Sequence, residues 1–331
     1  MRMKDKVGLV TAAGSGMGRA GAVRFAREGA SIAIVDRDVT ALAETARLVE
    51  GAGGNVLSMV GDLRSDDFSR DIVSRTRDRF GRLDFLWNHV GTPGPALIEG
   101  LNVELLDLAI DLNMRSGLLT TTEAIPLLRV SHGAVLFTAS TSGVVGSPVS
   151  PVYSMTKFGV IGLVRSLAKR YAPEGIRFNA LAPGAVDTPM LRDFYARPDL
   201  SDAQKQDFDA TLETRLKTFP MGRIATPDDI ANAANSSDAQ LRAAALSYVP
   251  GRSGDLVISP KAGWMFAGNG TTHGSATPDD QRVPILLYGF GIKPGKYDGA
   301  ATPADIAPTL AYLAGVTLPN ADGGPLKDAL R

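Results

Sequence analysis

The chain has 331 residues, enough to bury a large core and to hold one domain or two. Lysine plus arginine equals aspartate plus glutamate at 35 each, so the charge favours neither a nucleic acid nor a membrane surface as a partner. The absence of cysteine excludes disulfides, thiolate zinc sites and cysteine nucleophiles. With only a short apolar run at the amino end and no stretch of about 18 apolar residues, we expect a cytoplasmic protein.

The first expected unit is a strand, a glycine-rich turn and a helix. Residues 7–10 form an apolar run, residues 11–18 read TAAGSGMG, and residues 19–28 are amphipathic. This order is typical of the phosphate-binding unit of a Rossmann-type doubly wound parallel α/β sheet. Gly16, Gly18 and Gly21 fit the G-x-G-x-x-G pattern, whose exposed backbone amides approach a pyrophosphate. Alone, such a loop can equally be a simple turn.

The second expected strand, residues 31–35, ends in an acid. Asp36 follows Gly16 by 20 residues, where a carboxylate accepts hydrogen bonds from the adenine-ribose hydroxyls. A carboxylate there repels a 2′-phosphate and so favours NAD over NADP. Arg37 weakens this preference, because an arginine beside the acid can bind that phosphate.

The alternation of helices and strands continues to residue 128. We expect helices at 40–51 and 66–80, strands at 55–60 and 83–87, and a long helix over 101–128. Asn113 lies within that helix, and asparagine there indicates a cap or a kink because it is a poor helix former. Pro126 should kink or end the helix.

The segment 138–157 has the residues with the clearest chemistry. Tyr153 and Lys157 are four residues apart, so a helix places them on one face. An ammonium there should lower the phenol's pKa from about 10, giving a proton donor and acceptor for interconverting a carbonyl and an alcohol. Ser140 follows the apolar run at 134–139, so we expect it at a strand's carboxyl end, facing the same cavity. A lone Y-x-x-x-K can also be a solvated surface pair.

Together with the glycine motif, this segment resembles the short-chain dehydrogenase/reductase family over about residues 4–234. The resemblance implies an NAD cofactor and a small alcohol or ketone substrate. It implies that Tyr153 exchanges the hydroxyl proton and that Lys157 lowers the tyrosine's pKa and binds the nicotinamide ribose. Ser140 would hydrogen-bond the substrate oxygen, and Asn113 would hold a water in the proton relay.

The resemblance also implies the cofactor contacts. Asp62 and Leu63 would flank the adenine ring, the turn at residues 183–184 would lie against the nicotinamide, and Val186 and Thr188 would bind its carboxamide. The expected cofactor residues are Gly14, Ser15, Gly16, Met17, Gly18, Asp36, Asp62, Leu63, Asn88, Gly91, Tyr153, Lys157, Pro183, Gly184, Val186 and Thr188.

The chain departs from the family pattern at two places in this region. Ala12 stands where the family has glycine, which we expect to be tolerated at some cost in cofactor affinity, because Gly14 adds freedom. His89 replaces a structural asparagine, and we expect a hydrogen-bonded packing role rather than a general base.

The polar segment 191–219 is expected to cover the substrate as a lid. Helices 101–128 and 153–171 are expected to form a homodimer interface, but not a tetramer.

After Ala234 the family's last strand is missing, and residues 235–331 form a second expected segment. Parts of it, including the GTTHGS sequence at 270–275, resemble the carboxyl-terminal part of the alkaline phosphatase superfamily. There His273 would be a zinc ligand, but the other ligands and a nucleophile are missing, so we expect no metal site. We expect an atypical, non-catalytic α/β fragment, one strand of which fills the empty sheet edge; a loosely docked tail is the alternative.

Three functions follow from these motifs. The first is an NAD(H)-dependent oxidoreductase that interconverts a secondary alcohol and a ketone. The second is a catalytically impaired dinucleotide-binding protein, because the missing last strand supports the sheet. The third, a metal-dependent phosphohydrolase, is the weakest for lack of ligands. No motif specifies the substrate, although the valine and aromatic residues suggest an apolar one.

Overall fold

The computed structural model describes residues 1–202, 205, 211–212, 223–232, 256–257 and 327. The chain divides into two compact units, Met1–Ala276 and Thr277–Arg331, and every helix and strand discussed below belongs to the first. The predictions made from the sequence for residues 258–326, including His273, lie outside the described residues, as does part of the expected lid at 191–219.

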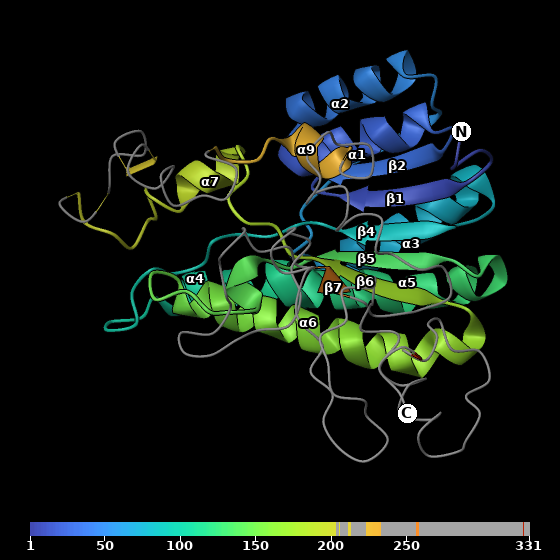
Figure 1. Ribbon diagram of the computed structural model, residues 1–331. Coiled ribbons are helices and arrows are strands. Elements are labelled where there is room, and N and C mark those ends of the chain that lie inside the picture. Colours follow the sequence, from blue (N-terminus) through green and yellow to red (C-terminus); the bar gives the residue numbers. More distant parts are fainter. Residues whose placement is uncertain (203–204, 206–210, 213–222, 233–255, 258–326, 328–331) are drawn as a thin grey trace. The chain divides into compact units, whose positions relative to one another are not determined.

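A parallel sheet forms the centre of the first unit, with the strand order β3-β2-β1-β4-β5-β6-β7 (Figure 1). This order and the intervening helices are those of a doubly wound Rossmann-type fold, as the sequence predicted. Its first six strands are β1 Val7–Thr11, β2 Ser31–Asp36, β3 Val56–Val60, β4 Phe85–Asn88, β5 Ala134–Thr138 and β6 Arg177–Leu181.

The seventh strand comes from the segment beyond the family resemblance. β7, Leu256–Val257, pairs in parallel with Ala180 and Leu181 of β6. A strand from the carboxyl-terminal segment therefore occupies the sheet edge beside β6, which confirms that part of the prediction.

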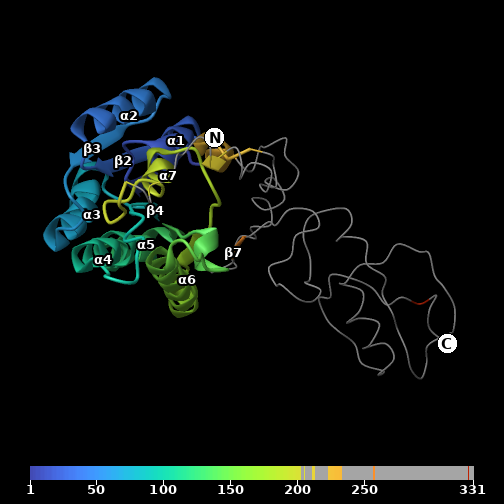
Figure 2. The same ribbon diagram turned by 90° about the vertical axis from the view of Figure 1, so that its left-hand side faces the viewer.

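Helices cover both faces of the sheet (Figure 2). One apolar cluster joins α1 and α2 to the sheet and contains Val10, Ile32 and Ile34; the other joins α3, α5 and α6 and contains Leu9 and Ala33. Neighbouring residues of one strand thus enter opposite cores, which explains why these strands read as continuous apolar runs. The helices are α1 Gly16–Arg27, α2 Val39–Gly51, α3 Asp66–Phe80, α4 Val103–Ile110, α5 Ser116–Ser131, α6 Pro151–Tyr171, α7 Pro189–Asp193 and α9 Pro227–Ala231.

The long helix expected at 101–128 is two helices joined by a π-helical turn, Asp111–Arg115. Asn113 lies in this turn, so the distortion predicted there takes the form of a widened helical turn. Pro126, in contrast, lies inside α5 and does not end it. Ala124 and Leu128 on either side are fully buried, and this packing outweighs the lost backbone hydrogen bond.

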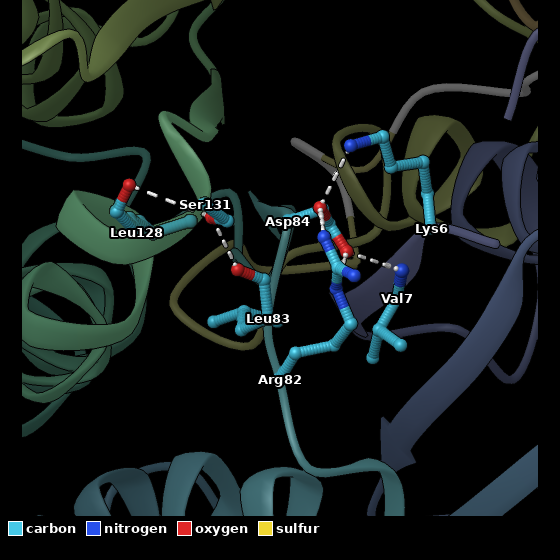
Figure 3. Close-up of polar contacts among 7 residues, drawn as sticks. All are labelled: Lys6, Val7, Arg82, Leu83, Asp84, Leu128 and Ser131. Carbon is cyan, nitrogen blue, oxygen red and sulfur yellow. Dashed lines mark hydrogen bonds and ion pairs between the residues drawn. The ribbon is translucent and has the colours of Figure 1, made fainter.

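A buried carboxylate stabilises the amino end of β4, away from the strand ends that form the site (Figure 3). Asp84 is 6% exposed and accepts hydrogen bonds from Lys6 Nζ (3.0 Å), Val7 N (2.9 Å) and two guanidinium nitrogens of Arg82 (2.8 and 2.7 Å). Burial alone would raise the pKa of Asp84, but the hydrogen bonds from Arg82, Val7 and Lys6 outweigh it and hold the pKa below its usual value. The ionised carboxylate thus joins the start of β1 to the start of β4.

Candidate active site

A cavity of about 750 Å³ opens at the carboxyl ends of the strands. Ligands of open parallel sheets bind at this edge, where the strand order reverses. Of the residues expected from the sequence, the cavity is lined by Ser15, Gly16, Met17, Asp36, Asp62, Leu63, Gly91, Ser140, Tyr153, Lys157, Pro183, Gly184, Val186 and Thr188. Four expected residues, Gly14, Gly18, Asn88 and Asn113, do not line it.

At the glycine-rich turn, packing requires two of the motif glycines. A Cβ at Gly18 would lie 2.2 Å from the carbonyl oxygen of Ala12, and a Cβ at Gly21 would lie 2.1 Å from the ring of Trp87. Gly16 has φ +52°, a left-handed conformation that glycine adopts without strain. The amino end of α1 can therefore approach β1 and leave its backbone amides bare toward the cavity, as a dinucleotide phosphate requires.

Ala12 adopts a backbone conformation that favours glycine. Its φ is +52°, in the left-handed region where the Cβ of an L-residue is strained. Gly14 has no such positive φ, so the freedom expected from Gly14 does not relieve the strain at Ala12. The fold accommodates an alanine at position 12, but the backbone of Ala12 keeps a positive φ that glycine would adopt without strain.

Asp36 lies at the end of β2, on the same side of the cavity. Its Oδ2 accepts a hydrogen bond from Gly14 N at 2.8 Å, and its Oδ1 accepts one from Asp38 N at 3.0 Å. Gly14 thus contributes by orienting the acid rather than by lining the cavity. Arg37 also lines the cavity, so the structure keeps both groups that bear on the choice between NAD and NADP.

Ser140, Tyr153 and Lys157 converge on the cavity from the end of β5 and from α6. All three are buried, at 9%, 8% and 3% exposure. Ser140 and Tyr153 share a hydrogen bond, and the Lys157 Nζ lies 5.4 Å from the centre of the Tyr153 ring. Lys157 Nζ donates to the carbonyl oxygen of Thr138 at 2.8 Å. The pair is therefore a buried one, not a solvated surface pair.

The expected lowering of the tyrosine pKa is not found in the protein alone. Burial raises the pKa of Tyr153 to about 12, although the hydrogen bond with Ser140 and the charge of Arg197 act in the opposite direction. Burial lowers the pKa of Lys157 to about 8. Withdrawal from water penalises the charged form of both groups, and the spacing in the sequence does not reveal that penalty.

Asn113 connects the loop after β4 to α6. Its Nδ2 donates to the carbonyl oxygen of Thr92 and to Thr156 Oγ1, both at 3.0 Å, and its Oδ1 accepts from Thr92 N at 2.8 Å. The side chain thus fixes the wall beside Lys157. A Cβ at Gly91 would lie 2.8 Å from Asn113 Oδ1 and 3.5 Å from Lys157 Nζ, which explains a glycine at this place.

Two polar residues at the carboxyl end of β4, Asn88 and His89, have structural partners. Asn88 donates to Gly117 O at 3.2 Å and to Thr121 Oγ1 at 3.0 Å, so its side chain joins β4 to α5. His89 Nδ1 lies 2.8 Å from Thr138 Oγ1, and burial, with a contribution from Lys157, lowers the pKa of His89 to about 3. A neutral, hydrogen-bonded His89 agrees with the packing role expected from the sequence.

The sequence analysis did not single out Arg197 as a cavity residue. Arg197, in the segment after α7, is 3% exposed and lines the cavity beside Phe194. The Phe194 ring lies edge-on to the Tyr153 ring, with centres 4.9 Å apart. The only available signal was an isolated arginine in a polar segment, because its partners are distant in the sequence.

The described residues contain no group of three or more histidine, aspartate or glutamate side chains that could hold a metal ion. Within the same residues, no helix combines the length and apolarity needed to span a membrane. A parallel sheet with a bare helix amino end, an acid at the end of β2 and a buried Ser-Tyr-Lys group is the arrangement expected of a dinucleotide-binding oxidoreductase.

The comparisons with known proteins identify the family. Residues 11–236 match the family model described as enoyl-(acyl carrier protein) reductase. The chain therefore belongs to the short-chain dehydrogenase/reductase family. The match ends close to residue 234, where the sequence analysis expected the resemblance to end, and it does not include the segment likened to the alkaline phosphatase superfamily.

Two curated relatives are enzymes of this family. The levodione reductase of Leifsonia aquatica is 36% identical over 234 residues, which cover 70% of this chain and 86% of the relative. The 3-oxoacyl-[acyl-carrier-protein] reductase of Thermotoga maritima is 31% identical over 232 residues, covering 70% and 89%.

Solved structures agree with this assignment. The crystal structure of levodione reductase matches with a TM-score of 0.65 at 31% identity, covering 77% of this chain and 96% of that one. The NAD⁺-bound xylitol dehydrogenase matches with a TM-score of 0.64 at 26% identity, covering 71% and 92%. An actinorhodin polyketide ketoreductase solved with NADPH matches with a TM-score of 0.64 at 28% identity, covering 70% and 88%.

Proposed function

We propose that the protein is an NAD(H)-dependent oxidoreductase that interconverts a secondary alcohol and a ketone. The observation that carries the proposal is the convergence of Ser140, Tyr153 and Lys157 on one cavity, whose other end has the bare amides of α1 and the carboxylate of Asp36. The residues fit a nicotinamide dinucleotide, which supplies or accepts the hydride when bound.

The roles of the three side chains follow from their geometry. The Ser140 hydroxyl, already hydrogen-bonded to Tyr153, orients the substrate oxygen beside the phenol. In reduction, Tyr153 donates its proton to the oxygen of the carbonyl as hydride arrives at its carbon; in oxidation, the phenolate accepts that proton back. Lys157 lines the cavity wall and would bind the nicotinamide ribose of the cofactor.

The pKa of Tyr153 bears on the direction of the reaction. With a pKa of about 12, the phenol is protonated at neutral pH and is ready to donate. Carbonyl reduction therefore starts from the resting protonation state, whereas alcohol oxidation requires prior loss of the phenol proton. Asn113 supports the relay by holding the Thr92 wall and α6 together.

NAD is the proposed cofactor, because the Asp36 carboxylate would repel a 2′-phosphate at the adenine ribose. The relatives include structures solved with either type of cofactor, so Asp36 supports this choice and the comparisons do not.

Within the same proposal, a cytoplasmic homodimer forms through α5 and α6. Leu118, Met155 and Phe158 support it, because these large apolar side chains on the two helices are 43–50% exposed.

The test of the function is the substitution Tyr153→Phe. Removal of the Tyr153 hydroxyl should lower kcat at least about 100-fold and leave NAD affinity within a few-fold of wild type. The assay follows NADH absorbance with a panel of cyclic and aliphatic ketones and alcohols. Tyr171→Phe is the matched control, because Tyr171 lies on the same helix and packs against Phe178, outside the cavity.

Near-normal turnover by Tyr153→Phe would refute the assignment of the proton donor. A wild-type protein that binds NAD but turns over no member of the panel would instead favour the catalytically impaired dinucleotide-binding protein.

A further inference from the structure

Arg197 is a buried cation at the substrate end of the cavity. It lines the same space as Ser140 and Tyr153, and it is 3% exposed. A buried charge is costly unless it is paired, so its partners indicate what it is for.

The hydrogen-bond partners of Arg197 are neutral oxygen atoms. Its guanidinium donates to the backbone carbonyls of Pro95 and Val149, each at 3.2 Å, and to Ser150 Oγ. Its Nε is buried and has no acceptor among the described residues. None of the ion pairs within 4 Å in this part of the chain includes Arg197.

The carboxylate of Asp199 does not form a hydrogen bond with this guanidinium. Asp199 interacts with Arg197 electrostatically, but its Oδ2 accepts hydrogen bonds from Ala96 N at 2.7 Å and Leu97 N at 3.0 Å. Asp199 therefore holds the loop after β4. Arg197 therefore lines the cavity without a hydrogen bond to any carboxylate of the described residues.

This cation is close to the reacting groups. The guanidinium carbon of Arg197 lies 4.9 Å from the centre of the Phe194 ring, which in turn lies 4.9 Å from the Tyr153 ring. One aromatic ring thus separates Arg197 from the proton donor. A substrate whose carbonyl contacts Tyr153 needs only a short chain to bring a second group to Arg197.

We propose that Arg197 is a specificity-determining residue that binds a carboxylate of the substrate, so that the preferred substrates are short oxo or hydroxy acids. The proposal rests on the oxidoreductase function and narrows its substrate class. Guanidinium and carboxylate form charge-assisted, often bidentate hydrogen bonds, which are stronger than bonds to neutral oxygens. This proposal replaces the apolar substrate that the sequence suggested.

A structural role for Arg197 makes a different prediction. If the residue only joins the loop at Pro95 to the start of α6, its removal lowers stability and affects all substrates equally. If it binds a carboxylate, its removal affects acids selectively. The ratio of activity between an acid and its methyl ester separates the two roles.

The experiment compares acetoacetate with methyl acetoacetate, and levulinate with methyl levulinate, as substrates with NADH. For wild type we expect kcat/KM to be about 10- to 100-fold higher for the acid of at least one pair. Arg197→Gln should abolish that preference and keep ester turnover, and Arg197→Lys should restore part of it. Arg192→Gln is the matched control, because Arg192 is an arginine of α7 outside the cavity and should keep the preference.

A binding measurement gives a readout without turnover. Calorimetric titration of the NAD-loaded protein with butyrate and with butyramide should show tighter binding of butyrate in wild type but not in Arg197→Gln. Equal activity with acid and ester, equal binding of the two probes, or a preference that Arg197→Gln retains would overturn the proposal. If the Arg197 proposal fails but the protein turns over the esters and Tyr153→Phe abolishes that turnover, the proposed oxidoreductase function still holds. If the protein does not bind NAD, the oxidoreductase function itself is refuted.

Discussion

The strained turn at Ala12 gives a prediction with a definite sign. Ala12 has φ +52°, and a left-handed conformation costs a non-glycine residue about 1–2 kcal/mol. Substitution by glycine removes this strain but increases the entropy of the unfolded chain, which costs about 0.4–1 kcal/mol. We therefore expect Ala12→Gly to stabilise the protein by about 0.5–1 kcal/mol, which corresponds to about 1–4 °C in Tm.

The neighbouring residue supplies the control. Ala13 is fully buried in the core that joins α1 and α2 to the sheet, and its φ is not positive. Ala13→Gly makes the same chemical change, loses a buried methyl and relieves no strain, so we expect it to destabilise the protein by about 1–2 kcal/mol.

Thermal and urea unfolding of the three proteins without cofactor measure these differences, and titration with NAD measures any gain in affinity from the relaxed turn. Two variants of opposite sign would support the argument. If Ala12→Gly lowers Tm as much as Ala13→Gly does, the strain assigned to this turn is wrong.

Two further substitutions test the cofactor preference and the buried carboxylate. Asp36→Ala should reduce the kcat/KM preference for NADH over NADPH about 10- to 100-fold, because a like charge is removed from the 2′-phosphate position. The control Asp38→Ala removes the N-cap of α2 outside the cavity and should leave this cofactor preference unchanged. A wild-type protein that prefers NADPH would contradict the role of Asp36. Asp84→Asn should destabilise the protein by about 1–3 kcal/mol in urea unfolding. Because the pKa of Asp84 is lowered in the folded state, the extra stability of wild type over Asp84→Asn is fully present above about pH 4 and is lost as the pH falls through that lowered pKa. A stability difference that does not change with pH would refute the ionic contribution.

Local patterns in the sequence were sufficient to predict the fold and the centre of the site. The apolar runs of β1 and β2 and the turn after β1 indicated a parallel sheet because such strands are buried on both faces. The positions of Ser140, Tyr153 and Lys157 depend on one strand end and one helix, so their spacing, taken with the glycine motif and the family resemblance, indicated that they face one cavity.

Features that depend on distant contacts were not predictable in this way. The π-helical turn is held by Asn113 through Thr92 and Thr156, residues 21 and 43 positions away. The partners of Arg197 lie 47 to 102 positions away and include backbone carbonyls, which no residue pattern reports. The raised pKa of Tyr153 follows from burial, which is a property of the assembled cavity.

The hydrogen-bond acceptor that anchors Lys157 is a main-chain atom. Lys157 Nζ donates to the carbonyl oxygen of Thr138, whereas the hydroxyl of Thr138 contacts Trp87 Nε1 and His89 Nδ1. A side-chain replacement at position 138 would therefore disturb the contacts of Trp87 on β4 and of His89 just after it, while Lys157 kept its acceptor. The position of the Lys157 amine depends on the backbone of β5, so substitutions of the surrounding side chains can leave it unchanged.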